Sequence, residues 1–512
     1  MKREEHLARL KNHTGPYDIA IVGGGATGLG AALDAAARGH SVVLIERHDF
    51  AKGTSSRSTK LVHGGVRYLR QGDVKLVLEA LRERGRLLRN APHLTHAMPF
   101  VIPCYRRGDV LFYWIGLKIY DALAGAKLGL GRTMMLSKSQ VQAHLPTITT
   151  DDLRGGVLYY DGQFDDAGLA IAIARTAAAN GAVLLNYMRC DGLIKSHGKV
   201  VGIRAWDVES DHAIEISARV VLNATGVFVD ELRQRDEPLA ATLVRPSQGV
   251  HLVLDRKFLP GDAALMIPKT ADGRVLFAVP WLDHLVVGTT DTPVKAPSLE
   301  PRAIEAEIEF ILTHAAMHLN PAPRREDVLS VFVGLRPLVN QRAAKRTAQL
   351  SRDHVIEVSE SNLVTITGGK WTTYRRMADD VVSRAEEIAN LPHIACSTEN
   401  LSLMDDAGAA VTALLASEPA LAQPLHHRLP YRHADIVWSV RQTMARTIED
   451  VLARRTRSLF LDARASIEAA EDVAAIMRRE LGWNEAERRR QIENYRSVAA
   501  GYLIPTAGAT ND

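Results

Sequence analysis

Three glycines and a glutamate near the start of the chain have the residue types and spacing that bind the phosphates and a ribose of a dinucleotide. Gly23, Gly25 and Gly28 form a G-x-G-x-x-G sequence, and Glu46 follows them. The first glycine permits a tight turn, the second lets the backbone approach a pyrophosphate, and the third lets a helix pack closely on a strand. The carboxylate accepts hydrogen bonds from ribose hydroxyls and favours a ribose without a 2′-phosphate.

The residues around these glycines predict the βαβ unit that brings them together. Residues 18–22 and 42–45 read as β-strands, and residues 29–38 read as a helix closed by Gly39. The N-terminus of such a helix presents free N–H groups and a partial positive charge to phosphate. A glycine-rich turn in an ordinary parallel sheet is the alternative interpretation, but the complete unit with Glu46 favours dinucleotide binding.

A second run, residues 54–69, is rich in hydroxyl groups and then in glycine, and it does not read as a regular helix or strand. Hydroxyl and backbone N–H groups suit the phosphate and ribityl chain of a flavin. Gly64 and Gly65 would let the backbone approach a flat ring. A solvent-exposed loop that caps the next helix is equally compatible with these residue types.

The two runs together resemble the FAD-dependent glycerol-3-phosphate dehydrogenases, within a wider group of flavin enzymes similar to D-amino-acid oxidase. The resemblance rests on the G-x-G-x-x-G unit followed by T-S-S-x-x-S/T-K-L-x-H-G-G-x-R-Y-L. It implies that the first motif holds FAD and that the second runs beside the flavin. The cofactor-binding residues implied by the second motif are Thr54, Ser55, Ser56, Lys60, Leu61, His63, Gly64 and Gly65.

Two later segments match the cofactor site of the same family. A strand at residues 220–222 runs into an A-T-G sequence, and in flavoproteins of this architecture such a strand returns to the nucleotide. Residues 367–375 lead into a helix whose N-terminus would face flavin oxygens. The cofactor contacts implied by the two segments are Ala224, Thr225, Gly226, Gly368, Gly369 and Thr372.

The resemblance implies oxidation of sn-glycerol 3-phosphate to dihydroxyacetone phosphate by hydride transfer to the flavin, with electrons then passed to a membrane quinone. A glycerol-3-phosphate oxidase that uses oxygen shares the first half-reaction and stays an alternative. Arginine forks and a lysine charge suit a phosphate dianion. The family motifs assign the substrate phosphate and hydroxyls to Arg336, Arg352 and Lys370.

This oxidation also needs a base that takes the proton of the substrate hydroxyl. His251 matches a histidine of the family, and a neutral imidazole accepts a proton near pH 7. We expect Arg336 to act with His251 by stabilising the developing alkoxide. The other candidate histidine, His63, lies next to Gly64 and would contact the flavin instead.

We expect an α/β plus α fold, with a Rossmann-like FAD-binding domain, an antiparallel β-sheet roof over the flavin and a C-terminal helical domain. Strand-like segments predict the roof at about residues 240–360, inserted into an FAD-binding domain of residues 1–385. Apolar residues at helical spacing predict the helical domain for residues 386–512. Residues 454–457 are basic, but acidic neighbours favour a solvated or domain-docking face over nucleic-acid binding.

The composition sets broad limits on the function. A chain of 512 residues with 46% hydrophobic and 24% charged residues is typical of a soluble globular protein of two or three domains. A net charge of +4 argues against a dedicated nucleic-acid binder, so a flavin-binding protein that contacts nucleic acid is only a distant alternative. The three cysteines form no C-x-x-C sequence, which indicates a reducing compartment and no metal site.

With the quinone acceptor that the resemblance implies, we expect a cytoplasmic protein that attaches peripherally to an anionic membrane, at the cytoplasmic face of the inner membrane. We find neither a secretory signal in the first 16 residues nor an apolar stretch long enough to span a bilayer. Residues 110–123 are apolar with Arg106, Arg107 and Arg132 nearby, so they form either a buried helix or an interfacial helix that presents Trp114. A homodimer is a further possibility.

Overall fold

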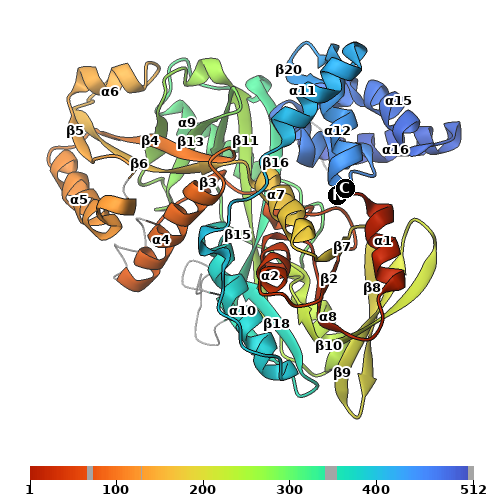
Figure 1. The fold of residues 1–512 in the computed structure, drawn as a ribbon. Helices are drawn as coiled ribbons and strands as arrows, with labels where there is room; N and C mark the ends of the chain where they lie inside the picture. The colour runs from red at the N-terminus through yellow and green to blue at the C-terminus, as the bar shows by residue number, and fades with distance from the viewer. Residues whose placement is uncertain (66–72, 129, 341–353, 505–512) are drawn as a thin grey trace.

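The computed structural model describes residues 1–65, 73–128, 130–340 and 354–504. Two large β-sheets lie side by side with helices over them, and helices from the C-terminal part of the chain pack against this body (Figure 1). The arrangement confirms the predicted fold class.

The first sheet contains the predicted dinucleotide unit. Its strands follow the order β17-β18-β10-β1-β2-β7, and those from β18 to β7 run parallel. β1 and β2 are almost fully buried, as expected for apolar strands in a sheet covered on both faces. The strands are β1 (Tyr17–Val22), β2 (Val42–Ile45), β7 (Val183–Leu185), β8 (Met188–Ser196), β9 (Lys199–Asp207), β10 (His212–Asn223), β17 (His354–Val358) and β18 (Leu363–Gly368).

The helix that follows the glycine turn, α2 (Ala26–Ala37), packs between α7 (Asp166–Ala179) and α10 (Tyr374–Ala389). Small residues allow this close packing. A Cβ atom at Gly30, for example, would lie 3.0 Å from the ring of Tyr374. The alanines of α2 are buried in the core cluster beneath. The helix therefore has little freedom to move, and its N-terminus is held at the carboxyl end of β1.

The second sheet is the roof, and it has ten strands. Their order is β15-β11-β14-β13-β12-β4-β6-β3, with β16 beside β11 and β5 beside β6. The strands are β3 (Leu61–Val62), β4 (Thr95–Cys104), β5 (Met134–Leu136), β6 (Gly155–Phe164), β11 (Val244–Asp255), β12 (Ala264–Ile267), β13 (Leu276–Trp281), β14 (His284–Gly288), β15 (Thr292–Pro293) and β16 (Val328–Val339).

The roof draws on more of the chain than the predicted residues 240–360. That range supplies β11 to β16, but β3 to β6 come from residues 61–164. The two parts join where β12 pairs in parallel with β4, through Ala264 opposite Phe100. β17, in contrast, belongs to the first sheet. Pairing between strands so far apart in the sequence leaves no mark on the local pattern of apolar and polar residues, so this pairing was not predicted.

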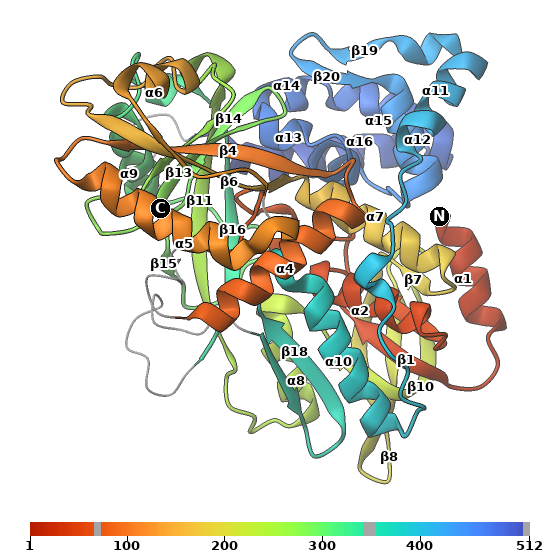
Figure 2. The ribbon, with the colours of Figure 1, turned by 60° about the vertical axis from the view of Figure 1, so that its left-hand side comes forward.

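The apolar stretch forms the helix α5 (Asp109–Leu128), which is interrupted at Gly125. Figure 2 shows α5 lying along the outside of the sheet that contains β4 and β6. Leu117 and Tyr120 are buried against the body, and Trp114 is half-buried there. Leu111, Phe112, Ile115 and Ile119 are each about half exposed or more. The prediction of a buried helix is therefore right for one side of α5 only.

Other helices complete the body. They are α1 (Arg3–Asn12), α4 (Val74–Asn90), α6 (Lys138–His144), α8 (Val229–Asp236) and α9 (Glu305–Ala316), which covers the outer face of the roof. None of the helices in the described ranges is both long enough and apolar enough to cross a bilayer.

The C-terminal helices pack on the roof around Val253, Trp281 and Phe332. They are α11 (Ala407–Ser417), α12 (His433–Thr443), α13 (Ser458–Leu461), α14 (Ala463–Glu468), α15 (Ala470–Leu481) and α16 (Glu485–Ala499), with a small sheet of β19 (Pro424–His426) and β20 (Leu429–Arg432). Arg454 and Arg455 form buried ion pairs with Asp49, at 2.6 and 2.8 Å. The basic run therefore docks the C-terminal helices on the rest of the protein, as one of the two favoured interpretations predicts.

Candidate active site

A cavity of about 690 Å³ lies at the carboxyl ends of the parallel strands. The loops after β1, β2, β10 and β18 meet there, because the carboxyl ends of neighbouring parallel strands share one edge of a sheet. This explains why motifs far apart in sequence come together. The predicted residues that line the cavity are Gly23, Gly25, Glu46, Thr54, Ser55, Ala224, Thr225, Gly226, Gly368, Gly369 and Lys370.

The glycine turn is as tight as the motif predicts. Gly23 has φ +114°, and a Cβ atom there would lie 2.6 Å from the carbonyl oxygen of Ala224. A Cβ atom at Gly28 would lie 1.9 Å from the carbonyl oxygen of Gly23. Gly28 does not line the cavity but lets α2 pack on the turn. The N-terminus of α2 therefore opens into the cavity, where its N–H groups suit an anion.

Two side chains support this end of the cavity. Ser55 Oγ accepts a hydrogen bond from the Ala26 N–H at 2.9 Å, so the second motif is tied to the first. The Glu46 carboxylate accepts the Gly24 N–H at 2.7 Å and the His48 N–H at 2.8 Å. A carboxylate has about four acceptor sites, which leaves Glu46 with capacity for ribose hydroxyls.

The second motif lies against the roof. Thr54 Oγ1 donates to the carbonyl oxygen of Leu335 at 2.7 Å. A Cβ atom at Gly334 would lie 2.5 Å from the carbonyl oxygen of Arg57, so β16 needs glycine there to let the loop approach. The loop thus connects the dinucleotide cavity with the sheet face that carries the predicted catalytic residues.

The side chains of Ser56, Lys60 and Leu61 are buried and do not line the cavity, so any contact of these residues with a cofactor stays a prediction. Lys60 Nζ donates to the carbonyl oxygen of Ser56 at 2.9 Å and to Asp166 Oδ2 at 2.7 Å. Burial lowers the pKa of Lys60 to about 7, against the opposing effect of Asp166. These side chains hold the loop in place.

His63 and Thr372, from the two predicted flavin segments, contact one another. Thr372 Oγ1 accepts the His63 N–H at 3.2 Å and donates to the His63 carbonyl oxygen at 3.4 Å. The Gly64 N–H donates to Tyr120 Oη at 2.8 Å, and a Cβ atom at Gly64 would lie 2.4 Å from that oxygen. The close contact with Tyr120 of α5 therefore requires glycine at position 64, whether or not a flavin ring also approaches this backbone. Neither His63 nor its neighbours Gly64 and Gly65 line the cavity itself.

Arg336 and His251 lie on the same face of the roof. Ser247 pairs with Arg336 and His251 pairs with Phe332, so alternate residues of β11 and β16 point the same way. The Arg336 guanidinium donates to Thr289 Oγ1 at 3.2 Å, to the Thr290 carbonyl oxygen at 3.0 Å and to Asp291 Oδ1 at 3.3 Å. It lies over Gly249, where a Cβ atom would be 2.4 Å from Nη2.

The two catalytic candidates differ in their access to solvent. His251 is only 2% exposed, and its Nε2 lies 2.9 Å from Thr59 Oγ1. Burial, with Lys60 and Arg336 as lesser causes, lowers the pKa of His251 well below its usual range. The imidazole is therefore neutral near pH 7. The Arg336 side chain is 24% exposed and can reach a ligand. Lys370 lines the cavity, and Arg352 lies outside the described residues.

Several residues near the site were missed from the sequence. Arg47, Arg189 and Arg235 line the cavity beyond Glu46. Thr59 and Tyr120 contact the predicted residues His251 and Gly64. Arg47 could have been predicted, because it directly follows Glu46, the predicted ribose-binding residue. Tyr120 could not, since a tyrosine is common on an apolar helix and does not indicate a site.

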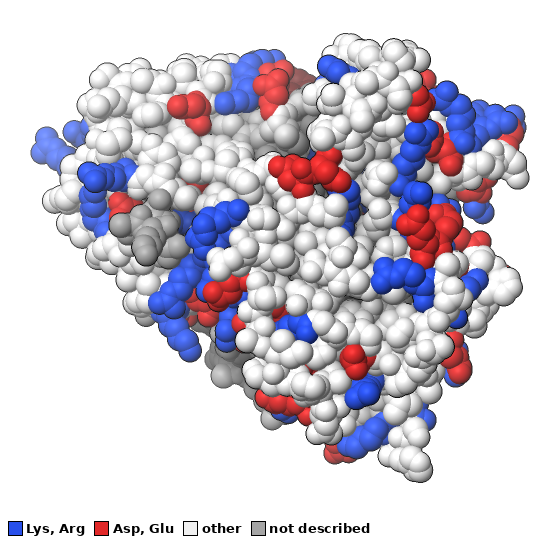
Figure 3. All heavy atoms as spheres, viewed as in Figure 1, with Lys and Arg blue, Asp and Glu red and all other residues white. Residues whose placement is uncertain are grey.

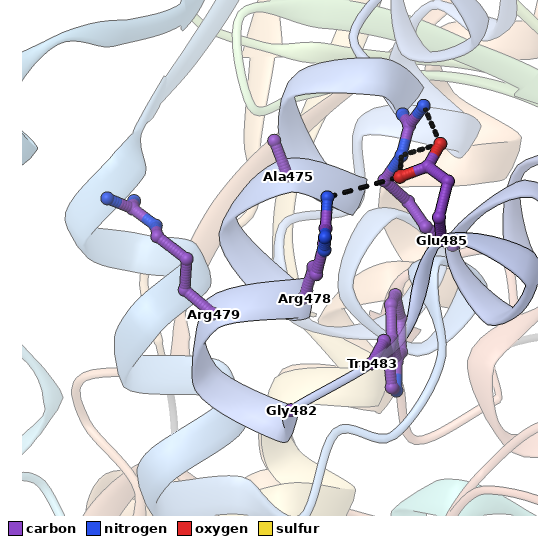
Figure 4. Close-up of a pocket in the computed structure, with 7 residues that line it drawn as sticks. Ala475, Arg478, Arg479, Gly482, Trp483 and Glu485 are labelled. Carbon is purple, nitrogen blue, oxygen red and sulfur yellow. Dashed lines mark hydrogen bonds and ion pairs between the residues drawn. The ribbon is translucent and has the colours of Figure 1, made fainter.

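A second cavity, of about 500 Å³, lies in the C-terminal helical region. Figure 4 shows Arg478, Trp483 and Glu485 among the side chains that line it. Glu485 forms ion pairs with Arg478 at 3.1 Å and with Arg488 at 2.7 Å, so its carboxylate offsets their charge. This cavity contains none of the predicted site residues.

Comparison with known proteins agrees with this geometry. The profile described as FAD dependent oxidoreductase matches residues 18–375, and the profile described as C-terminal domain of alpha-glycerophosphate oxidase matches residues 361–488. The human mitochondrial glycerol-3-phosphate dehydrogenase is 39% identical over 544 aligned residues, which cover 96% of this chain and 74% of that protein. The chain belongs to the FAD-dependent glycerol-3-phosphate dehydrogenase family.

Solved structures share this fold. The glycerol-3-phosphate dehydrogenase from Bacillus halodurans, complexed with FAD, is 28% identical, with a TM-score of 0.80 and 99% of each chain covered. The L-alpha-glycerophosphate oxidase from Mycoplasma pneumoniae, with FAD bound, is 16% identical, with a TM-score of 0.57, and covers 76% of this chain and 98% of its own. The second likeness concerns the fold alone.

The described residues fit the FAD of this family. The glycine turn leaves no room for a side chain, the first N–H groups of α2 open into the cavity, and Glu46 has acceptor capacity for a ribose. The cavity extends from this turn past Thr54 to Gly368 and Lys370, which is the direction of the roof. A dinucleotide would fit this cavity with its pyrophosphate at the glycine turn and its flavin at the end near the roof.

Proposed function

We propose that the protein oxidises sn-glycerol 3-phosphate to dihydroxyacetone phosphate and passes the electrons to a membrane quinone. The observation that supports this most is the placement of Arg336 and His251 on a roof beside a dinucleotide cavity, in a chain of this family. FAD, when bound, accepts the hydride. The chain itself binds the phosphate, orients the substrate carbon and receives the hydroxyl proton.

The phosphate clamp is assigned to Arg336 and Lys370, with Arg352 as a third member. Arg336 is held by three acceptors, so its guanidinium is oriented before the substrate arrives. Pre-orientation matters because a small misplacement of the reacting carbon costs rate. The same guanidinium would stabilise the alkoxide that develops as the proton leaves.

We propose the outer side of α5 as the surface that docks on an anionic membrane. Four half-exposed apolar side chains of α5 continue onto Met134 and Met135 of β5, which are 47% and 43% exposed. Arg106, Arg107 and Arg132 are exposed at the margins of this surface. In Figure 3 the left-hand part of the molecule is mostly uncharged, with basic side chains at its edge. Apolar insertion with a basic rim fits a bilayer that carries anionic headgroups.

This surface also supports a quinone as the acceptor. Tyr120, on the inner side of α5, contacts Gly64 of the predicted flavin loop. An α-helix with its side chains is about 10 Å across. An acceptor dissolved in lipid at the outer side of α5 would therefore come within about one helix diameter of that loop.

Vesicle binding tests the membrane proposal. Phe112 and Ile115, which are 62% and 49% exposed, are better targets than Trp114, which is half-buried. Phe112→Ser with Ile115→Ser should weaken binding to phosphatidylcholine–phosphatidylglycerol vesicles by roughly tenfold or more, since each buried side chain contributes about 1.5–3 kcal/mol. Binding should also loosen as salt rises.

A matched control is Leu239→Ser, because Leu239 is 99% exposed and lies outside this surface. It should leave vesicle binding unchanged. Equal binding by the control and the double variant would exclude the α5 surface. Turnover with a water-soluble acceptor reports whether the double variant keeps its fold and substrate site.

Oxygen is the alternative acceptor. An oxygen-electrode assay with and without a soluble quinone analogue separates the two, because a dehydrogenase turns over only when the analogue is present, whereas an oxidase consumes oxygen without it. Rapid oxygen consumption with hydrogen peroxide as product would favour the oxidase. Location at the cytoplasmic face of the inner membrane and a homodimer stay predictions, which cell fractionation and light scattering test.

A further inference from the structure

The buried His251 contacts the hydroxyl of a residue that is itself partly exposed, Thr59. Thr59 Oγ1 lies 2.9 Å from His251 Nε2. Thr59 is partly exposed, whereas His251 is 2% exposed. A substrate hydroxyl can therefore reach the threonine more readily than the imidazole.

The imidazole has no freedom to turn outward. Its ring stacks on Phe332 with 4.7 Å between centroids and 11° between planes. Gly288 is the cross-strand partner of His251, and a Cβ atom there would lie 2.4 Å from His251 Cδ2, so the ring fills the space beside the glycine. His251 can then accept a proton only through a group that already contacts it.

The position of Thr59 is fixed by its two neighbours, Ser58 and Lys60, because both donate to one buried carboxylate. Ser58 Oγ donates to Asp166 Oδ2 at 2.7 Å, and Lys60 Nζ donates to the same oxygen at 2.7 Å. Asp166 and Lys60 are fully buried. This clamp fixes the backbone on both sides of Thr59 and so fixes the direction of its hydroxyl.

We propose that Thr59 relays the proton of the substrate hydroxyl to His251. This inference rests on the proposed function. With FAD bound to take the hydride of the C–H bond, the substrate oxygen would release its proton to Thr59 Oγ1 and become a carbonyl. The proton of Thr59 passes to His251 Nε2, which requires the imidazole tautomer with hydrogen on Nδ1. Thr59 ends with one proton, as it began, and His251 gains one.

The charges around the relay favour a neutral acceptor at rest. The positive charges of Lys60 from the loop and of Arg336 from β16 both disfavour protonation of His251. The negative charge of Asp166 from α7 opposes them. The Arg336 guanidinium lies over Gly249, two residues from His251 on the same face of β11. A substrate oxygen between Thr59 and Arg336 would be positioned both to lose its proton and to be stabilised as the charge develops.

Thr59→Val tests the relay, because it keeps the shape and removes the hydroxyl. The rate of flavin reduction by glycerol 3-phosphate, measured anaerobically by stopped flow, should fall roughly 10²–10⁴-fold, the range that general-base catalysis contributes. Thr59→Ser should recover most of the rate. His251→Asn should lose about as much as Thr59→Val, and the double variant should be little worse than either, because residues that act as a unit are not additive.

Thr133→Val is the matched control. Thr133 is 2% exposed, its hydroxyl has no partner among the residues that the structure describes, and it lies outside the site. In the Thr133→Val variant, glycerol 3-phosphate should reduce the flavin at the wild-type rate. A Thr59→Val rate within threefold of wild type, or additive losses in the double variant, would overturn the relay. If glycerol 3-phosphate does not reduce the flavin of the wild-type protein at all, the proposed function itself fails, and the relay fails with it.

Discussion

Arg336→Ala removes the side chain that we assign to the substrate phosphate. The guanidinium is 24% exposed and is held by Thr289, Thr290 and Asp291, so it presents a fixed positive fork. Losing a hydrogen bond to a charged group costs about 1.5–3 kcal/mol. Since about 1.4 kcal/mol is a factor of ten, kcat/KM for glycerol 3-phosphate should fall roughly 10- to 150-fold.

The loss has a second source. Asp291 accepts from Ser247 and from Arg336. Without the guanidinium, its carboxylate faces the substrate phosphate, and like charges repel, so the observed loss should lie toward the upper end of that range. Arg336→Lys keeps a charge but not the bidentate fork, and we expect an intermediate loss.

Steady-state kinetics with a water-soluble acceptor measure the effect, with glycerol as the comparison substrate. Glycerol lacks the phosphate, so it should lose only the part of the effect that comes from stabilising the alkoxide, and its loss should be smaller. Arg245→Ala is the matched control, because Arg245 is an exposed arginine of β11, the strand paired with β16. Equal losses on glycerol and on glycerol 3-phosphate would refute the assignment of Arg336 to the phosphate.

Two further predictions concern the cofactor and stability. Gly25→Val should yield colourless protein of lower thermal stability, because a Cβ atom lies 3.1 Å from Ser55 Oγ and the branches extend toward the pyrophosphate site; stoichiometric FAD after purification would contradict this. His6 is buried, and burial lowers its pKa from 6.5 to about 4, so the unfolded chain binds a proton first and stability falls as pH drops from 6.5 to 4. The loss from His6 reaches about 3 kcal/mol, and His6→Gln should make the fall of the melting temperature shallower over that window, while His48, whose pKa burial also lowers to about 4, keeps its own part; an unchanged slope would contradict it.

The sequence was most informative where a motif dictates backbone geometry. The G-x-G-x-x-G unit predicted β1, α2 and β2 within a few residues, because Gly23 and Gly28 are required by close backbone contacts that the structure contains. The convergence of Glu46, Gly226 and Gly368 on one cavity was predictable once the strands were read as parallel.

Long-range pairing and side-chain direction were not predictable in the same way. The strands β4 and β6 join the roof through partners far away in the sequence. Lys60 belongs to a motif that runs beside the cofactor site, yet its backbone φ of +64° and its ion pair with Asp166 turn it inward. A sequence match reports that a residue is present at a site, but burial decides whether its side chain faces the ligand or the core.

The most direct test of the account is anaerobic addition of sn-glycerol 3-phosphate to the purified, FAD-loaded protein while the flavin absorbance is recorded. We predict that the oxidised flavin bands bleach, that dihydroxyacetone phosphate appears in equal amount, and that a quinone analogue restores the colour. Flavin that stays oxidised at saturating glycerol 3-phosphate would contradict the proposed function.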